Sequence, residues 1–306
     1  MWPIDEYGIV RRETALDHGI TARRIDDAVR TKELLILARG RYLPNTSLAE
    51  ADDPHGELYR YRSIAAGLGR GRPVLSHDSA AVLGWRLLYP DRQRIHVTNG
   101  RDGGGSTRPR RVVHAGPLSA DAVVEIDGVL VTSKARTAVD VALGTGRFPQ
   151  ALTVFDVALA HGVPPEAMER LLVGNRRGVA LARRALSFAD GRSESPGESW
   201  SRAQMIEEEL PLPDLQVEHH LASGRVARCD FGIGDVFVGE FDGLVKYRRR
   251  MRGGDDPEDV VIQEKIREDE LRDLGLDVGR WIWHDLRAGT MIPKLKARYD
   301  RLGIRY

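Results

Sequence analysis

The last third of the chain constrains the fold most, because helical and strand patterns alternate there in a defined order. Residues 225–233 and 236–242 each have the pattern of a strand, and Gly234-Asp235 between them is a turn signal. A helical pattern from Glu198 to Leu210 precedes these strands. A helix from about Val260 to Leu274 and a strand from Val278 to Trp283 follow them. The order of helix, strands, helix and strand predicts a mixed α/β unit whose sheet is flanked by helices.

Three carboxylates fall within the two central strands. Asp230 lies late in the first strand, and Glu240 and Asp242 lie in the second with one residue between them, so the last two project from one face. Carboxylates gathered on one face are costly unless a cation neutralises them, and magnesium prefers such oxygen ligands. The pattern therefore favours a divalent-metal site that activates water against a phosphodiester. The spacing alone equally allows an ordinary hairpin whose carboxylates point into solvent.

Four short segments carry a family resemblance. Ser195 to Ser199, Cys229 to Phe231, Gly239 to Gly243 and Glu264 to Gly275 resemble the very-short-patch-repair-endonuclease-like domain of the PD-(D/E)XK nuclease superfamily. This resemblance implies a DNA endonuclease that uses Mg²⁺ or Mn²⁺. In that interpretation Asp230 and Glu240 bind the metal, Asp242 is an additional ligand, and Glu198 is the supporting acid on the first helix.

One position departs from the superfamily pattern. Its third site residue is most often lysine, which stabilises developing negative charge, whereas this chain has Asp242 there. We expect Lys265 to replace it rather than Lys246, because Lys265 lies on a helix that is predicted to pack against the sheet. A solvated lysine paired with Asp269 is the alternative. The side chains predicted to pack that helix are Ile262, Ile266 and Leu274.

Glu198 also has two interpretations. Ser195-x-x-Glu198 with Pro196 between them is a capping box at the start of a helix. The sequence leaves the choice between a helix cap and a metal-supporting acid open.

The segment from Gly8 to Pro44 predicts a winged helix. A first helix from Arg11 to Asp17 is followed by Thr21 as the N-cap of a second helix, Ala22 to Lys32. Two strands then surround an Arg39-Gly40 turn, which gives a basic wing tip. The second helix has an apolar stripe that leaves its arginines on or near the opposite side, where they could meet phosphate.

The chain also resembles a second family. Gly8 to Pro44, Leu75 to Leu83 and Val131 to Asp140 resemble the AbiEi family of antitoxins and transcriptional regulators. This resemblance implies sequence-specific binding of double-stranded DNA by the winged helix. Asp26 and Asp27 lie on the same helix and would repel phosphate unless they face cytosine amino groups or the protein itself. The predicted contacts are Arg23, Arg24 and Arg30 toward the major groove and Arg39 and Arg41 toward the backbone or minor groove.

The middle of the chain predicts a mixed domain of short strands and helices. Strands are expected near 94–98, 111–114 and 129–132, and helices at 136–143 and 148–161. His77 follows Ser76 at the start of a predicted helix and is interpreted as a surface histidine beside a helix cap.

Length and composition set the outer limits. A chain of 306 residues fits two or three domains, and 42% hydrophobic with 30% charged residues is ordinary soluble usage. Turn-rich linkers at 45–56 and 190–197 predict a winged-helix DNA-binding domain at 1–48, an α+β middle domain at 55–190 and an endonuclease-like domain at 191–306. The net charge of +1 means that any nucleic-acid surface must come from local segregation of charge.

The N-terminus lacks a signal-peptide pattern, no apolar run reaches bilayer length, and Cys229 is the single cysteine. These features predict a cytoplasmic protein without a membrane partner.

Two functions from different classes remain. The first is a divalent-metal-dependent endonuclease whose winged helix selects DNA. The second is a non-catalytic AbiEi-type antitoxin and autorepressor, with a degenerate nuclease fold and a cognate toxin protein as a further candidate partner. The sequence does not determine the oligomeric state.

Overall fold

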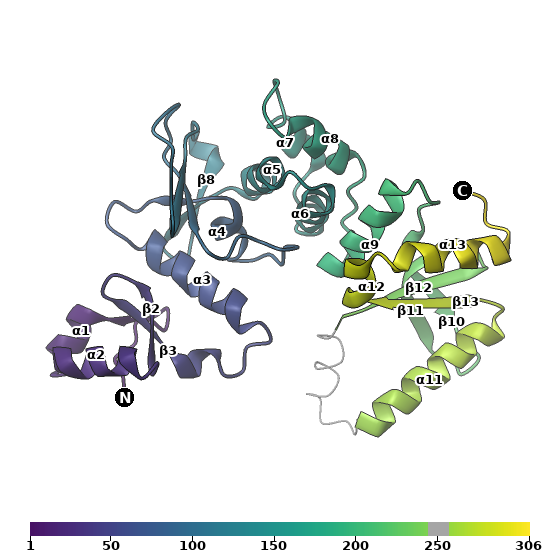
Figure 1. The fold of residues 1–306 in the computed structure, drawn as a ribbon, viewed down its shortest axis with the longest axis horizontal. Helices are drawn as coiled ribbons and strands as arrows, with labels where there is room; N and C mark the ends of the chain where they lie inside the picture. Colours follow the sequence, from purple (N-terminus) through teal and green to yellow (C-terminus); the bar gives the residue numbers. More distant parts are fainter. Residues whose placement is uncertain (244–256) are drawn as a thin grey trace. The chain divides into compact units, whose positions relative to one another are not determined.

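The computed structural model describes residues 1–243 and 257–306, with the backbone alone for 257–261. The described chain forms two compact units, Met1–Gly144 and Thr145–Tyr306, each combining sheet and helix (Figure 1). This agrees with the predicted multidomain α/β class. The predicted boundary near residue 190 lies inside the second unit.

The first unit begins with an N-terminal motif of two helices and a small sheet. β1 (Val10–Arg11), β2 (Leu34–Ala38) and β3 (Arg41–Pro44) form an antiparallel sheet in the order β1-β3-β2. Helices α1 (Arg12–Asp17) and α2 (Ala22–Arg30) precede the β2–β3 hairpin. Ala15, Ile25, Ala28 and Leu34 are almost completely buried in its core, because the apolar stripe of α2 faces the hairpin.

The rest of the first unit is a six-stranded sheet with the order β6-β7-β5-β4-β9-β8. Helix α3 (Pro54–Gly67) packs against β4, β5 and β9, and Leu75, Val97 and Val131 form part of that core. The predicted strands and helices of this region are confirmed to within a few residues. The remaining elements are β4 (Val74–Leu75), α4 (His77–Ala81), β5 (Ile95–Thr98), β6 (Ser106–Arg108), β7 (Arg111–His114), β8 (Val123–Ile126), β9 (Val129–Thr132) and α5 (Lys134–Thr145), with short 3-10 turns at Asn45–Leu48 and Ala120–Ala122.

The second unit begins with a helical layer. Helices α6 (Phe148–Ala160), α7 (Pro165–Glu169) and α8 (Val179–Ser187) lead into α9 (Pro196–Glu207). A buried ion pair joins α6 to α9, with Arg202 Nη1 3.1 Å from Asp156 Oδ2. Helix α6 packs against both α8 and α9, and its contacts with α9 cross the predicted boundary near residue 190.

A four-stranded mixed sheet follows, in the order β10-β11-β12-β13. Its strands are β10 (Asp214–His220), β11 (Val226–Ile233), β12 (Phe237–Asp242) and β13 (Asp277–Ile282), and only β12 and β13 are parallel. Helix α11 (Pro257–Asp273) lies on one face, while α9, α12 (Trp283–Ala288) and α13 (Met291–Leu302) lie on the other (Figure 1). The predicted order of helix, strands, helix and strand is confirmed. Trp283 begins α12 instead of ending the last strand.

None of the helices in residues 1–243 and 257–306 combines the length and apolar character of a membrane span.

Candidate functional site

Two regions of the protein carry the predicted functional residues: the N-terminal motif and the carboxylates of β11 and β12. In the N-terminal motif, the Thr21 side chain accepts a hydrogen bond from Arg24 N at 3.2 Å, which confirms it as the N-cap of α2. Ile25 and Ala28 are fully buried, so the helix exposes its opposite side to solvent.

The acidic residues in and just after α2 form ion pairs with arginines of the protein. Asp26 lies 3.2 Å from Arg12 Nη1, and Asp27 lies 2.7 Å from Arg30 Nη2. Arg24 Nη2 donates to both oxygens of Glu33 at 2.7 and 2.8 Å. The carboxylates of Asp26 and Asp27 therefore face arginines of the protein itself, which is one of the two arrangements that would limit their repulsion of phosphate.

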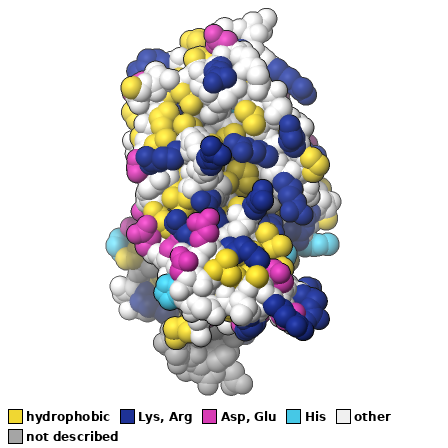
Figure 2. All heavy atoms as spheres, turned by 90° about the vertical axis from the view of Figure 1, so that its left-hand side faces the viewer, with side chains coloured by type: hydrophobic (Ala, Val, Ile, Leu, Met, Phe, Trp, Pro, Cys, Tyr) yellow, Lys and Arg dark blue, Asp and Glu magenta, His cyan; other side chains and the backbone are white. Residues whose placement is uncertain are grey.

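Arg23 and Arg39 differ in their surroundings from Arg24, Arg30 and Arg41, the other arginines predicted to contact DNA. Both are exposed, and neither forms a hydrogen bond or ion pair with any residue that the structure describes. Arg23 lies in the first turn of α2, and Arg39 lies in the turn between β2 and β3. Figure 2 draws one face of the molecule. This face carries many Lys and Arg side chains, and its Asp and Glu side chains lie mainly in the lower half.

Arg41 serves the fold of the first unit. Its guanidinium donates to the backbone carbonyls of Ala65 and of Leu68, the latter at 2.7 Å, and so ties β3 to the end of α3. The last carbonyls of a helix have no partner within the helix, which explains why a neighbouring arginine is held there. The structure therefore corrects the expectation that Arg41 points toward DNA.

His77 is also placed differently from its prediction. Its ring stacks on His114 with centroids 3.6 Å apart, and His114 Nε2 lies 2.9 Å from His96 Nδ1. Asp91 Oδ2 lies 3.2 Å from His96 Nε2 at the other end of this row. His77 is thus a half-buried member of a histidine cluster, not a surface residue. The cluster is non-local, since α4, β5 and β7 each supply one ring.

In the second unit, Asp230 and Glu240 lie next to each other on β11 and β12. Phe231 pairs with Gly239, so Asp230 and Glu240 take the adjacent positions on the two strands. Both residues are buried, with 6% and 7% of their surface exposed. Asp230 Oδ2 accepts a hydrogen bond from Phe241 N at 2.8 Å. The predicted proximity of these two carboxylates is confirmed.

Two arginines hold the Glu240 carboxylate. Arg267 Nη2 on α11 lies 2.5 Å from Oε1, and Arg280 Nη2 on β13 lies 2.9 Å from Oε2. Arg280 Nη1 also lies 3.5 Å from Asp242 Oδ2. Both arginines bind Glu264 as well. Each oxygen of Glu240 therefore already has a charged partner.

The pKa values of this network follow from burial and charge. Burial alone would raise the pKa of Glu264, but hydrogen bonds from Arg267 and Arg280 outweigh it and lower that pKa to about 2. Burial, followed by the charge of Glu240, raises the pKa of Cys229 to about 12. Cys229 is therefore a neutral thiol in the core of the second unit.

These carboxylates do not fit a preformed magnesium site in the described arrangement. Asp230 and Glu240 are suitable hard oxygen donors, yet a cation would have to displace Arg280 and Arg267 from Glu240. Within the described part of the chain, no three His, Cys, Asp or Glu residues are placed to hold a metal together. Metal binding at Asp230, Glu240 and Asp242 stays a prediction.

The premise that placed Lys265 beside these carboxylates is wrong. Ile262, Ile266 and Leu274 are 53%, 42% and 48% exposed, whereas Leu271 is fully buried and faces the sheet. Helix α11 therefore turns Glu264, Arg267 and Leu271 inward. Lys265 is exposed, with no ion pair to any described residue, including Asp269. Lys246 lies outside the described residues.

Ser195 is the N-cap of α9, and Glu198 supports this cap in the structure. Ser195 Oγ donates to Glu198 Oε1 at 2.8 Å, and Glu194 N and Gln216 Nε2 donate to Oε2 at 2.9 and 3.0 Å. Glu198 N in turn donates to Ser195 Oγ at 3.2 Å. The residue is fully buried, and these contacts match the capping interpretation.

Sequence reasoning missed Arg267 and Arg280. The sequence offered one signal for each arginine. Arg267 follows Glu264 by three residues in a predicted helix, so the two side chains can pair. Arg280 lies next to Trp281 in a predicted strand, so the two side chains point to opposite faces of the sheet. Neither signal identifies Glu240 as the shared partner, since that requires the register of β12 with β13 for Arg280 and the packing of α11 on the sheet for Arg267.

Comparisons with known proteins give relatives without an assigned activity. A scan of protein families finds no match to this chain. The uncharacterized proteins MT2308 and Rv2248 of two Mycobacterium tuberculosis strains are each 32% identical to it over 182 residues. That match covers 58% of this chain, and the chain spans 64% of the length of these relatives.

A solved structure is also similar. The crystal structure of the RV2827C protein from Mycobacterium tuberculosis is 20% identical, with a TM-score of 0.36, over 70% of this chain and 79% of that one.

Proposed function

We propose that this chain binds double-stranded DNA through residues 1–48, which act as a winged helix. The observation that carries the proposal is the exposure of Arg23 on α2 and of Arg39 at the β2–β3 turn, with no described residue neutralising either one. In winged helices the second helix enters the major groove, while arginines at the wing meet phosphate or the minor groove. The pairing of Asp26 and Asp27 with arginines supports the proposal, because it reduces their repulsion of phosphate.

Fluorescence anisotropy with a mixed-sequence duplex, at several salt concentrations, tests DNA binding by the full chain. Binding should weaken with salt, because phosphate contacts release counterions. The double variant Arg23→Ala, Arg39→Ala should bind more weakly and lose about 0.9 in the logarithmic salt slope for each phosphate contact removed. Selection from a random duplex pool then identifies any preferred sequence.

The matched control is Arg287→Ala, Arg305→Ala, which removes two exposed arginines from the second unit. It should bind DNA as the parent does. The proposal fails if the parent shows no binding at low salt, or if the two double variants behave alike.

A second candidate function is the hydrolysis of DNA phosphodiester bonds by the second unit. It is favoured by the adjacent carboxylates Asp230 and Glu240 on a mixed sheet flanked by helices. The arginines on Glu240 count against a site that is ready to bind metal. Incubation of supercoiled plasmid with Mg²⁺ or Mn²⁺, beside a Glu240→Ala variant, tests this candidate.

Of the two functions, the arginine pairs favour a non-catalytic DNA-binding regulator of the AbiEi type. A toxin protein is the partner proposed with that function. A promoter-reporter assay supports the regulator if the parent represses transcription and the Arg23→Ala, Arg39→Ala variant does not. Metal-dependent nicking that Glu240→Ala abolishes would establish the endonuclease instead.

A further inference from the structure

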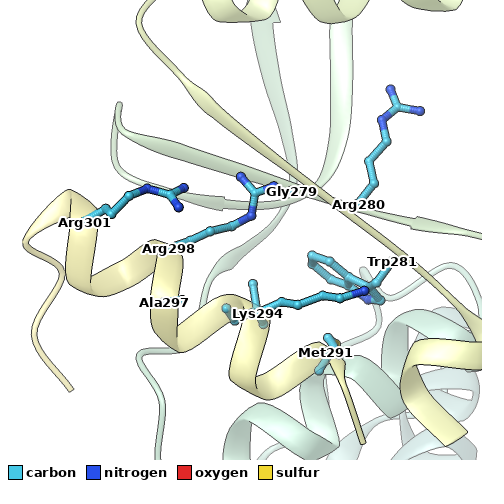
Figure 3. Close-up of a pocket in the computed structure, with 9 residues that line it drawn as sticks. Gly279, Arg280, Trp281, Met291, Lys294, Ala297, Arg298 and Arg301 are labelled. Atoms are coloured by element: carbon cyan, nitrogen blue, oxygen red, sulfur yellow. The ribbon is translucent and has the colours of Figure 1, made fainter. Parts of the chain in front are cut away.

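A cavity of about 280 Å³ lies between β13 and α13 in the second unit. Gly279, Trp281 and Met291 contribute to its lining. Lys294, Arg298 and Arg301 also line it, and their spacing of four and three residues places them on one face of α13. In Figure 3, Arg298 and Arg301 lie side by side above α13, Lys294 reaches toward Trp281, and the Arg280 guanidinium points away.

The charges around this cavity do not balance. None of its lining residues in the described structure is acidic. Arg298 and Arg301 share the single carboxylate of Asp277, which lies 3.1 Å from Arg301 Nη2. Lys294 Nζ lies 2.6 Å from Asp285 Oδ1. Three cations thus have two carboxylate partners among these groups, which leaves an excess of one positive charge.

The three cations keep donors for a further anion. A guanidinium carries five N–H donors and an ammonium carries three, and the bonds to Asp277 and Asp285 use only some of them. Charge-assisted hydrogen bonds from arginine suit the oxygens of a phosphate group. The adjoining apolar lining suits the group that a phosphate ester carries.

We propose that this cavity binds the phosphate group of a phosphate monoester through Arg298 and Arg301, which share one carboxylate, while Lys294 lines the cavity nearer Trp281. The site lies in the second unit, and it does not depend on DNA binding by residues 1–48. The same chemistry is supplied by a free nucleotide and by the 5′-phosphate at a DNA end. A cavity of about 280 Å³ is too small for a length of duplex, so the terminal phosphate group of a DNA end would enter it.

Calorimetry on the full chain tests the site with inorganic pyrophosphate and with a nucleoside 5′-monophosphate. Arg298→Gln and Arg301→Gln should each weaken binding by about tenfold or more, the usual cost of losing a hydrogen bond to a charged group. Lys296→Gln is the matched control, because Lys296 lies on the same helix, does not line the cavity, and bonds to Glu208. Its affinity should equal that of the parent.

Further ligands distinguish the sources of the phosphate. Tighter binding of the nucleotide than of its unphosphorylated nucleoside supports a small-molecule ligand, and preference for a 5′-phosphorylated oligonucleotide over its 5′-hydroxyl form supports a DNA end. Arg301 is 65% exposed, so Arg301→Gln decides the matter if Arg298→Gln fails to fold. The inference is wrong if no phosphate ligand binds at millimolar concentration, or if Lys296→Gln loses as much affinity as Arg301→Gln.

Discussion

Arg280 and Glu240 face each other as register partners across the parallel strands β12 and β13, with Arg280 Nη2 2.9 Å from Glu240 Oε2. Arg267 holds the other oxygen of Glu240 from α11. The pairing of β12 with β13 and the packing of α11 on the sheet therefore each bring an arginine to the buried carboxylate of Glu240. The stability of the second unit thus depends on a residue of its candidate site.

The first prediction concerns the loss of that charge. Glu240→Gln should lower the free energy of unfolding by about 1–3 kcal/mol, because two partly buried guanidiniums lose a charged acceptor. Asp269→Asn is the control, since Asp269 is 58% exposed and its pair with Arg272 should contribute under about 1 kcal/mol. Urea unfolding measures both variants, and equal losses would contradict the argument.

The second prediction is acid sensitivity of the second unit through Glu264. Its folded-state pKa of about 2 lies below the ordinary value of 4.5, so the folded state favours the ionised form. The resulting stability is present above pH 4.5 and is lost as the pH falls from 4.5 toward 2. Unfolding followed by the tryptophans of this unit across that window should show the loss. Glu264→Gln should be less stable at neutral pH and should flatten the slope.

The third prediction concerns the histidine cluster of the first unit. Burial lowers the pKa of His77, His96 and His114, and the pKa of His114 falls to about 4. The folded state therefore keeps these rings neutral, and stability should fall as the pH drops below their ordinary value of 6.5. Asp78 opposes this trend, because burial raises its pKa to about 6 and the folded state takes up its proton first.

The variant His114→Phe separates the two effects. Phenylalanine can keep the ring contact with His77 but cannot take a proton, so the destabilisation between pH 6.5 and 4 should shrink. Asp91, Arg94 and Arg136 also act on the cluster and are unchanged in this variant. Thermal unfolding of parent and variant at each pH provides the measurement. An unchanged pH profile would show that the rings do not control acid stability.

Local patterns in the sequence were sufficient for most elements. The stripe of Ile25 and Ala28 fixed the buried side of α2, and the turn at Gly234-Asp235 fixed the β11–β12 hairpin. The hairpin in turn placed Asp230 beside Glu240. Each of these inferences depends on residues close together in the chain, where helix and strand periodicity apply.

Tertiary packing decided the features that the sequence did not predict. Ile262 and Ile266 have helical spacing, yet α11 buries Leu271 and directs Arg267 toward the sheet, because Glu240 requires a counter-charge there. Arg280 reaches Glu240 through a parallel register between segments about forty residues apart, and no local pattern encodes that register. The same limit applies to His77, whose ring partners come from two later strands.

The last prediction asks whether the arginine network excludes metal. Magnesium and Arg280 would compete for the same oxygens of Glu240 and Asp242, so Arg280→Gln should bind Mg²⁺ or Mn²⁺ more tightly than the parent in calorimetry. The substitution removes the positive charge of Arg280 from the metal position. It also leaves the carboxylates of Glu240 and Asp242 without that partner, and both changes favour binding of a cation. Arg272→Gln is the control, because it removes a guanidinium from α11 that pairs with Glu268 and Asp269. Its metal affinity should match the parent. Any gained binding should disappear when Asp230→Ala and Glu240→Ala are added to Arg280→Gln. If the parent itself binds metal tightly and Arg280→Gln weakens that binding, Arg280 supports the metal site, and the endonuclease becomes the better proposal.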